Sequence, residues 1–171
     1  MSKMIALSLE TLADLERTLH TEIPLTRAMG VTVAQFDATG LTLRAPLEPN
    51  INHKSTAFGG SLAILATLAG WGLLQLLLRE HPPVAVVIQE SSVQYLRPVA
   101  EDMQAICSMP QTGELEKFLR MLTRKGMARI ELEVLIPAGG ETAVRFRGRF
   151  VALDMHRHVH AQPVHGATPD G

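Results

Sequence analysis

The first part of the chain passes from helical to alternating periodicity. Leucines recur at helical spacing over Leu7–His20 with charged residues between them, which predicts an amphipathic helix that ends near Glu22–Pro24. Val31–Phe36 has the composition of a short strand, and Leu41–Leu47 alternates apolar and polar residues like a strand with one buried face. The turn signal Asp37–Gly40 separates them, so the two strands should form a hairpin.

The most apolar segment comes next. Ser61–Leu78 contains no charged residue, and it predicts a long helix that starts at Gly59 or Gly60 and is stopped by His81–Pro83. Its length alone would suit a membrane span. Polar residues within the segment and the alternating strands that flank it instead favour a core helix buried by a sheet.

Two glycines lie inside this predicted helix. Gly70 and Gly72 each cost about 1 kcal/mol relative to alanine in a helix. Their presence indicates that another backbone or a ligand passes close to the helix, and a sheet wrapped around it would meet that requirement.

The second half of the chain is rich in strand patterns. Strands are expected at Val84–Val99, Asp102–Met109, Met127–Ile136 and Thr142–Leu153, and a short amphipathic helix at Glu114–Thr123. The pair Gly139-Gly140 predicts a hairpin turn between the last two strands. That turn would set Glu133 opposite Arg147 and Glu131 opposite Arg149 on the outer face.

The order of elements indicates the fold class. Strands and helices do not alternate regularly, so a parallel sheet is disfavoured, and an antiparallel sheet around one buried helix is the economical α+β solution. We expect a single domain over residues 1–153 with an N-terminal helix. Residues 154–171 form a polar tail with four of the seven histidines, and we expect this tail to be partly disordered.

Composition and charge narrow the possible functions. The 171 residues carry a formal net charge of -1, so nothing points to nucleic acid or to an anionic membrane surface. Cys107 is the only cysteine, which excludes an internal disulfide and a cysteine-based metal site. His156, His158 and His160 alternate in the tail, but without nearby carboxylates they are weak evidence for a metal, and we expect none. No apolar leader follows Met1, so we expect a cytoplasmic protein.

The strongest candidate for a functional site is the amide-rich loop that leads into the long helix. Pro49–Ser61 is polar and contains Gly59-Gly60 where the helix should start. Unpaired N–H groups at a helix start can hold a carbonyl oxygen or an anion, and glycine lets a ligand approach the backbone. The same loop could equally be a cap with tight packing.

Three stretches resemble a known family. Asn52–Leu62 is similar to the Asn…His-Gly-Gly loop of hotdog-fold acyl-CoA thioesterases, and Tyr95–Val99 with Asp102 is similar to their Arg-Pro-Val turn. Together with Ile23–Gly30 and Leu68–Leu73, these stretches look like the thioesterase domain of the YiiD C-terminal type. The resemblance covers roughly Leu7 to Leu153, and it implies the hotdog fold, a curved antiparallel sheet wrapped around one long central helix.

The resemblance also implies a function and an assembly. It implies a homodimer, which could pair further into a tetramer, and thioester hydrolysis in a cleft between subunits. We expect no metal or other cofactor, and coenzyme A is part of the substrate. By position, Asn52 matches the asparagine that orients the thioester or the water, and the Gly60 N–H matches the donor to the carbonyl. Thr67 falls where many relatives have a carboxylate, and Phe58 replaces the histidine that often precedes the glycine pair.

These departures leave the general base open. His53 in the loop and Glu90 in the strand after the helix are the two candidates, each with a solvated alternative. Gln89, Glu90, Ser91 and Ser92 form a polar island that either lines the cleft or faces solvent. The residues expected to contact substrate are Asn50, Phe58, Gly59, Gln89 and Ser91.

Other interpretations remain. Arg145, Arg147 and Arg149 could meet the phosphates of coenzyme A, but the glutamates expected opposite them favour a solvated face. Without the helix carboxylate, the domain could be a non-catalytic acyl-thioester binding or dimerisation module. A hotdog dehydratase is a further alternative, and it would need an active histidine with an acidic partner.

Overall fold

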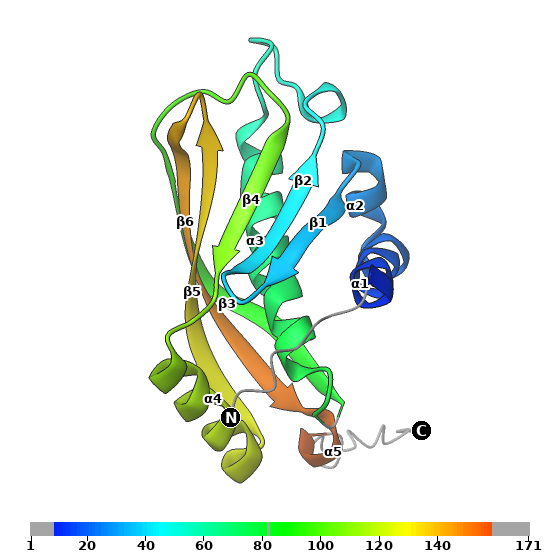
Figure 1. Ribbon diagram of the computed structural model, residues 1–171, viewed down its shortest axis with the longest axis vertical. Coiled ribbons are helices and arrows are strands. Elements are labelled where there is room, and N and C mark those ends of the chain that lie inside the picture. Colours follow the sequence, from blue (N-terminus) through cyan, green and yellow to red (C-terminus); the bar gives the residue numbers. More distant parts are fainter. Residues whose placement is uncertain (1–8, 82, 159–171) are drawn as a thin grey trace, which may run out of the picture.

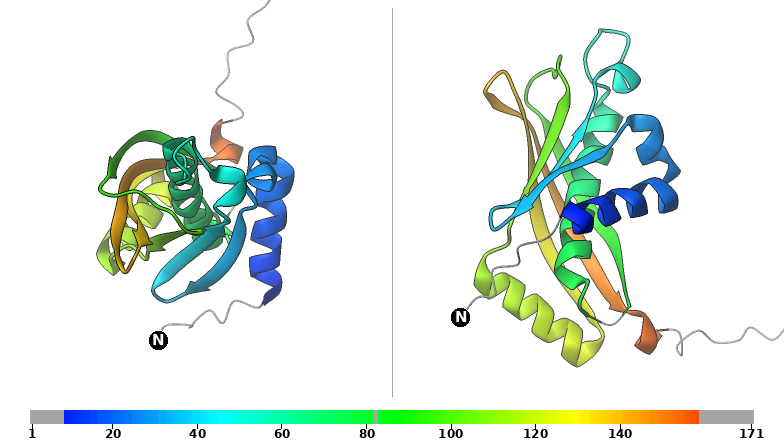
Figure 2. Two further views of the ribbon diagram at one scale, coloured as in Figure 1. Left: turned by 90° about the horizontal axis from the view of Figure 1, so that it is seen from above. Right: turned by 45° about the vertical axis from the view of Figure 1, so that its right-hand side comes forward.

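A computed structural model describes residues 9–81 and 83–158, and it shows a six-stranded antiparallel sheet curved around one long helix (Figures 1 and 2). The helices are α1 (Leu9–Glu22), α2 (Pro24–Met29), α3 (Gly59–Leu78), α4 (Thr112–Lys125) and α5 (Met155–His158), with a 3-10 turn η1 (Glu48–Asn50). The strands are β1 (Thr32–Asp37), β2 (Gly40–Ala45), β3 (Val84–Tyr95), β4 (Met103–Ser108), β5 (Met127–Ala138) and β6 (Glu141–Asp154). The predicted α+β hotdog architecture with an N-terminal helix is confirmed.

The strands lie in the order β1-β2-β4-β5-β6-β3, so β3 forms one edge of the sheet. The predicted β1–β2 hairpin is present. The β5–β6 ladder has the predicted register, with Glu131 opposite Arg149 and Glu133 opposite Arg147. Both pairs form ion pairs on the outer face.

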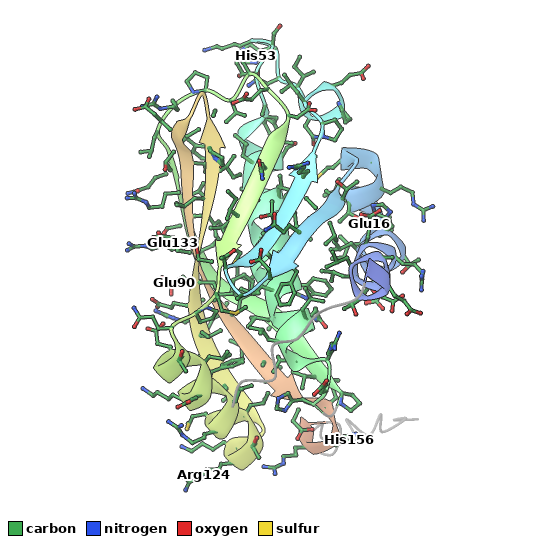
Figure 3. All side chains as sticks on the ribbon, viewed as in Figure 1. Glu16, His53, Glu90, Arg124, Glu133 and His156 are labelled. Carbon is green, nitrogen blue, oxygen red and sulfur yellow. The ribbon has the colours of Figure 1, made fainter. Side chains whose placement is uncertain are left out.

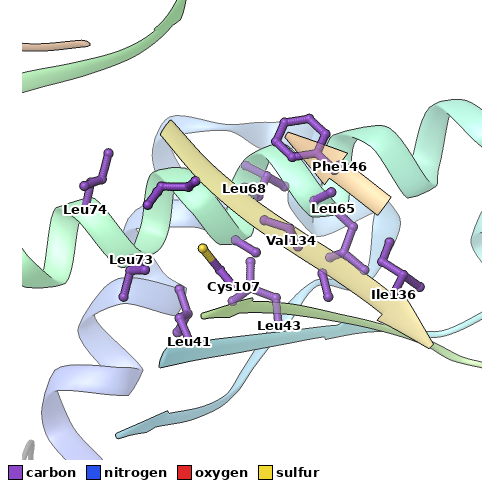
Figure 4. Close-up of a cluster of buried hydrophobic side chains, with 14 of the residues drawn as sticks. Leu41, Leu43, Leu65, Leu68, Leu73, Leu74, Cys107, Val134, Ile136 and Phe146 are labelled. Atoms are coloured by element: carbon purple, nitrogen blue, oxygen red, sulfur yellow. The ribbon is translucent and has the colours of Figure 1, made fainter. Parts of the chain in front are cut away.

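The core lies between α3 and the inner face of the sheet (Figure 4). Both helix glycines are explained by close packing, as the sequence predicted. A Cβ at Gly70 would come within 2.6 Å of the Phe150 ring on β6, and a Cβ at Gly72 within 2.9 Å of Leu41 on β2. Among the described residues α3 alone has the length and composition of a membrane span, and 61% of its most apolar window is buried inside the protein, as suits a core helix.

Some boundaries differ from the sequence predictions. The strand predicted over Val84–Val99 ends at Tyr95, because the N–H groups of Leu96 and Arg97 both donate to the Ala143 carbonyl and Pro98 has no N–H. The helix α2 was not predicted. Six residues are too few for a clear helical period, although Pro24 starts it and Gly30, at φ 69°, ends it.

The C-terminal tail is only partly described. The strand β6 continues to Asp154, and the short helix α5 follows it. The Arg157 guanidinium donates to the carbonyls of Thr123 and Arg124, at 3.1 Å each, and so caps the C-terminus of α4. The expectation of partial disorder falls mainly on residues 159–171, which lie outside the described part.

Candidate functional site

The loop before α3 is organised by the side chain of Asn52. Its Oδ1 accepts the N–H groups of Lys54 at 2.7 Å and Thr56 at 3.3 Å. Its Nδ2 donates to Thr56 Oγ1 at 3.0 Å and to the Ala57 carbonyl at 3.2 Å. Because both amide hydrogens are used within the loop, Asn52 shapes the approach to the helix start and has no donor left for a substrate.

Asn50 is buried, with a 3% exposed surface, and its Nδ2 donates to the carbonyls of Met29 and Pro46. Its own carbonyl accepts the Phe58 N–H at 2.7 Å. These bonds tie the loop to the end of α2 and to the residue that follows β2. Asn50 is therefore a buried structural residue and does not lie on an accessible surface.

The start of α3 presents unpaired donors. Phe58 occupies the N-cap without a side-chain cap, and the first bond at this end of the helix runs from the Leu62 N–H to the Phe58 carbonyl at 3.1 Å. Within the described chain, the N–H groups of Gly59, Gly60 and Ser61 have no hydrogen-bond acceptor. Three donors at the positive end of a 20-residue helix can bind a carbonyl oxygen or an anion.

Aromatic side chains frame these donors. The Phe58 ring is 57% exposed and lies over Gly60, where an added Cβ would come within 2.3 Å of it. The Tyr95 hydroxyl donates to the Gly59 carbonyl at 2.9 Å. A shallow hollow of about 380 Å³ lies beside Gly59, between Ala57 and the Tyr95–Val99 segment. The site therefore combines backbone donors with an apolar, accessible rim.

Thr67 lies further along the same half-exposed face of α3 as Gly60. Its Oγ1 donates to the Ala63 carbonyl at 2.9 Å, one turn back. With its hydrogen used in this way, the hydroxyl can accept a hydrogen bond from a water molecule but cannot remove a proton from it.

A bulge in β3 decides which polar residues reach this face. The register of β3 against β6 shifts between Ile88 and Glu90, so Gln89 is the extra residue. Glu90 then lies opposite Arg149 on the outer face and forms an ion pair with it at 2.8 Å, while Gln89 accepts from Arg129. Hydrogen bonding to Glu131 and the nearby charge of Glu90 raise the pKa of Arg149.

The same bulge turns Ser91 to the inner face, opposite Gly148 of β6. Of the predicted polar island, the structure therefore brings only Ser91 to the side of the sheet on which α3 lies. Gln89 and Glu90 point away from Gly60 and Thr67. The solvated interpretation of Arg147 and Arg149, with glutamates opposite them, matches the observed ion pairs.

His53 lies at the exposed tip of the loop, as Figure 3 shows. It shares with Asn52 the loop that leads to α3, whereas Glu90 lies on the outer face of β3. The part of the chain that the structure describes contains no group of three His, Cys, Asp or Glu side chains that could hold a metal ion. Of the four tail histidines, His160 and His165 are outside the described residues.

Tyr95 is the site residue that sequence reasoning did not select. A lone tyrosine at the end of a strand gives no sign that its hydroxyl reaches back to the first residue of a helix 36 positions earlier. The only available signal was its place directly before Leu96-Arg97-Pro98-Val99.

Known proteins resemble this chain in sequence and in fold. Residues 12–154 match a family described as "Putative thioesterase (yiiD_Cterm)". The fold is similar to a protein of unknown function from Chlorobaculum tepidum TLS, at 35% identity and a TM-score of 0.82, over 85% of this chain and 95% of that one. It is also similar to a "putative thioesterase" from Shewanella oneidensis, at 30% identity and a TM-score of 0.72, over 84% and 98% of the two chains.

A more distant likeness shows the fold alone. A thioesterase from Haemophilus influenzae is 15% identical, with a TM-score of 0.67, over 91% of this chain and 94% of that one.

Proposed function

Since the chain belongs to the YiiD C-terminal family of thioesterases, we propose that it hydrolyses an acyl-CoA or acyl-carrier thioester by direct attack of water. The observation that carries this proposal is the set of unpaired N–H groups at Gly59, Gly60 and Ser61, framed by exposed Phe58 and Tyr95. The Gly60 N–H would polarise the thioester carbonyl. A preorganised donor of this kind is worth roughly 3 kcal/mol in the transition state.

We propose further that the site lies between two copies of the chain. Gly60 and Thr67 are seven residues apart on one helix, which separates them by about 10.5 Å along its axis. Reacting atoms must approach within about 3–3.5 Å of one another. One thioester therefore cannot contact both residues of the same copy, whereas Gly60 of one copy and Thr67 of the other could share it.

The edge strand supports this assembly. Two hydrogen bonds tie α3 to β3, from Tyr95 to the Gly59 carbonyl and from Trp71 Nε1 to the Val86 carbonyl. The stretch of β3 between these points includes Val87 and Ile88, which are 47% and 38% exposed. If two β3 strands pair antiparallel about Ser91, the two α3 helices lie side by side and Gly60 of one copy is level with Thr67 of the other. The result is a homodimer with a continuous sheet, which could pair further into a tetramer.

In this arrangement Thr67 accepts a hydrogen bond from the attacking water, and Ser91 adds a second hydroxyl on the same face. Of the two candidate bases, His53 is favoured because it lies on the loop that leads to the N–H donors. Glu90 is held on the outer face by Arg149. Asn52 positions the loop, and Phe58 and Gly59 contact the substrate. No metal or other cofactor is required, and we expect the protein to act in the cytoplasm.

The test is free thiol release from a panel of acyl-CoAs. We expect hydrolysis by the wild type, a loss of about 10- to 100-fold in kcat/KM for Thr67→Ala and His53→Gln, and a change within about twofold for Glu90→Gln. A large loss for Glu90→Gln with no loss for His53→Gln would reverse the assignment of the base.

A second candidate function rests on Thr67 itself. Since its hydroxyl hydrogen is donated to the Ala63 carbonyl, this face of α3 offers no base of its own, and the domain could bind an acyl thioester without turnover. Saturable binding of acyl-CoA by a folded dimer that releases no thiol would favour this binding module over the enzyme. The dehydratase alternative has no comparable support, because His53 lacks an acidic partner among the described residues.

A further inference from the structure

A second hollow lies between α4 and β5, at the opposite end of the molecule from the Asn52 loop (Figure 1). Its volume is about 510 Å³. It is lined by Glu114, Lys117, Phe118, Met121, Lys125, Met127, Ala128, Arg129, Ile130 and Glu131. We call it the α4–β5 groove.

The groove exists because β4 is shorter than β5. The two strands pair only at Ile106–Leu135 and Cys107–Val134, so residues 127–133 of β5 have no strand beside them on that edge. The chain leaves β4 to form α4, which packs beside this open stretch. The helix takes the place of a strand without filling the whole space.

The floor of the groove is apolar. Phe118, Ala128 and Ile130 are 2%, 4% and 6% exposed, and the half-buried Met121 and Met127 complete it. Methionine side chains adapt to varied ligand shapes. Ligand sites typically enclose roughly 300–1,000 Å³ and combine a mostly apolar lining with a few polar groups, so both the size and the lining fit a small apolar molecule.

The charges in the groove are unevenly placed. Lys125 lies at the end where α4 turns into β5, and within the described chain it has no ion-pair partner. The Arg129 guanidinium donates to Gln89 on β3, on the far side of β6 from the groove. Glu131 is already paired with Arg149 at 2.8 Å, and Glu114 and Lys117, which have opposite charges, lie in the first half of α4, toward the other end. One end of an apolar groove is therefore cationic.

We propose that the α4–β5 groove binds an aliphatic carboxylate, with its chain against Phe118, Met121 and Ile130 and its head group facing Lys125. Charge complementarity selects the anionic head, and the apolar floor selects the chain. This binding does not depend on thioester hydrolysis, although the acid released by such a reaction belongs to the same chemical class.

The experiment is calorimetric titration of the full chain with octanoate, decanoate and dodecanoate below their micelle concentrations, and with decanol as the neutral comparison. We expect saturable binding whose affinity rises about threefold to fourfold per methylene group. Decanoate should bind about tenfold more tightly than decanol. The absence of saturable binding, or equal affinity for decanoate and decanol, would overturn the proposal.

Two neighbouring residues provide a matched pair of variants. Lys125→Gln should weaken decanoate binding about tenfold and leave decanol binding unchanged. Arg124→Gln removes a positive charge from the preceding residue of α4, which is exposed and does not line the groove. This control should change neither decanoate binding nor decanol binding. Met121→Gln should reduce the gain in affinity per methylene. If Lys125→Gln has no effect, or the same effect as Arg124→Gln, the carboxylate binds elsewhere and the proposal is wrong.

Discussion

Asn52 supports the loop of the candidate site through its side-chain amide. Its amide makes four hydrogen bonds, all within the loop that delivers Gly59 and Gly60 to the start of α3. At the scale of single residues, the sequence singled out this loop as the candidate site. It could not distinguish a contact residue from a supporting one, because that difference depends on where each amide hydrogen goes.

Asn52→Ala should lower the free energy of unfolding by about 1–3 kcal/mol, since four backbone and side-chain partners lose their bonds, and it should reduce thiol release in parallel. Asn52→Asp keeps the two acceptor bonds and should lie between alanine and the wild type. Urea denaturation and acyl-CoA hydrolysis measure the two effects. Lost activity at unchanged stability would instead indicate a direct contact with substrate.

Cys107 makes a second prediction at this scale, because burial in β4 raises the pKa of its thiol to about 12. The thiolate is the reactive form, so a pKa about three units above normal makes the native protein roughly a thousandfold less reactive at pH 8. Titration with a thiol reagent should detect one thiol per chain in denaturant and almost none in the folded protein. Rapid native labelling would show that β4 opens readily. The same inertness keeps Cys107 from interfering with a thiol-release assay.

At the scale of elements, the sequence predicted α3 accurately but did not predict the faces of β3. The length of α3 and the close approach at its glycines followed from an uncharged apolar run with two costly residues. In β3, the bulge at Gln89 reverses the faces of all later side chains, so strict alternation from Ile88 would have placed Glu90 inward. No residue type in Gln89-Glu90-Ser91 marks a bulge, and only the ladder with β6 shows it.

Gly70→Ala tests the packing of α3. Its Cβ would lie 2.6 Å from the ring of the fully buried Phe150, so the strain of about 1–3 kcal/mol should exceed the helix-propensity gain of about 1 kcal/mol. Gly113→Ala is the matched control, because nothing lies within 4 Å of its added Cβ, and it should be neutral or slightly stabilising. Denaturation at equal protein concentration compares them. A stabilising Gly70→Ala would contradict the observed packing.

At the scale of the whole molecule, β3 is one of the two edge strands of the sheet, and α1 packs near the other, β1. The outer edge of β3 has no neighbour in the described chain, and in the proposed assembly a second copy pairs with this edge. The family resemblance in the sequence implied a dimer. The chain pattern alone could not show which edge is open, because strand order depends on contacts between distant segments.

Ile88→Lys should convert a dimer to a monomer by placing a charge where the two β3 strands meet. Ile106→Lys is the matched control, since Ile88 and Ile106 are 38% and 36% exposed on different strands. Light scattering of both variants gives their masses. Dissociation by Ile106→Lys alone would place the interface elsewhere.

The central claim is that Gly60 and its loop from one copy act with Thr67 of the other, and a mixed dimer tests it most directly. Asn52→Ala and Thr67→Ala chains would be co-expressed with different tags, and the heterodimer would be isolated and assayed for thiol release on the best acyl-CoA substrate. We predict about half of the wild-type activity, because one of its two sites is intact, while each homodimer is nearly inactive. A heterodimer as inactive as both homodimers would show that the two residues act within one copy, and it would contradict the account.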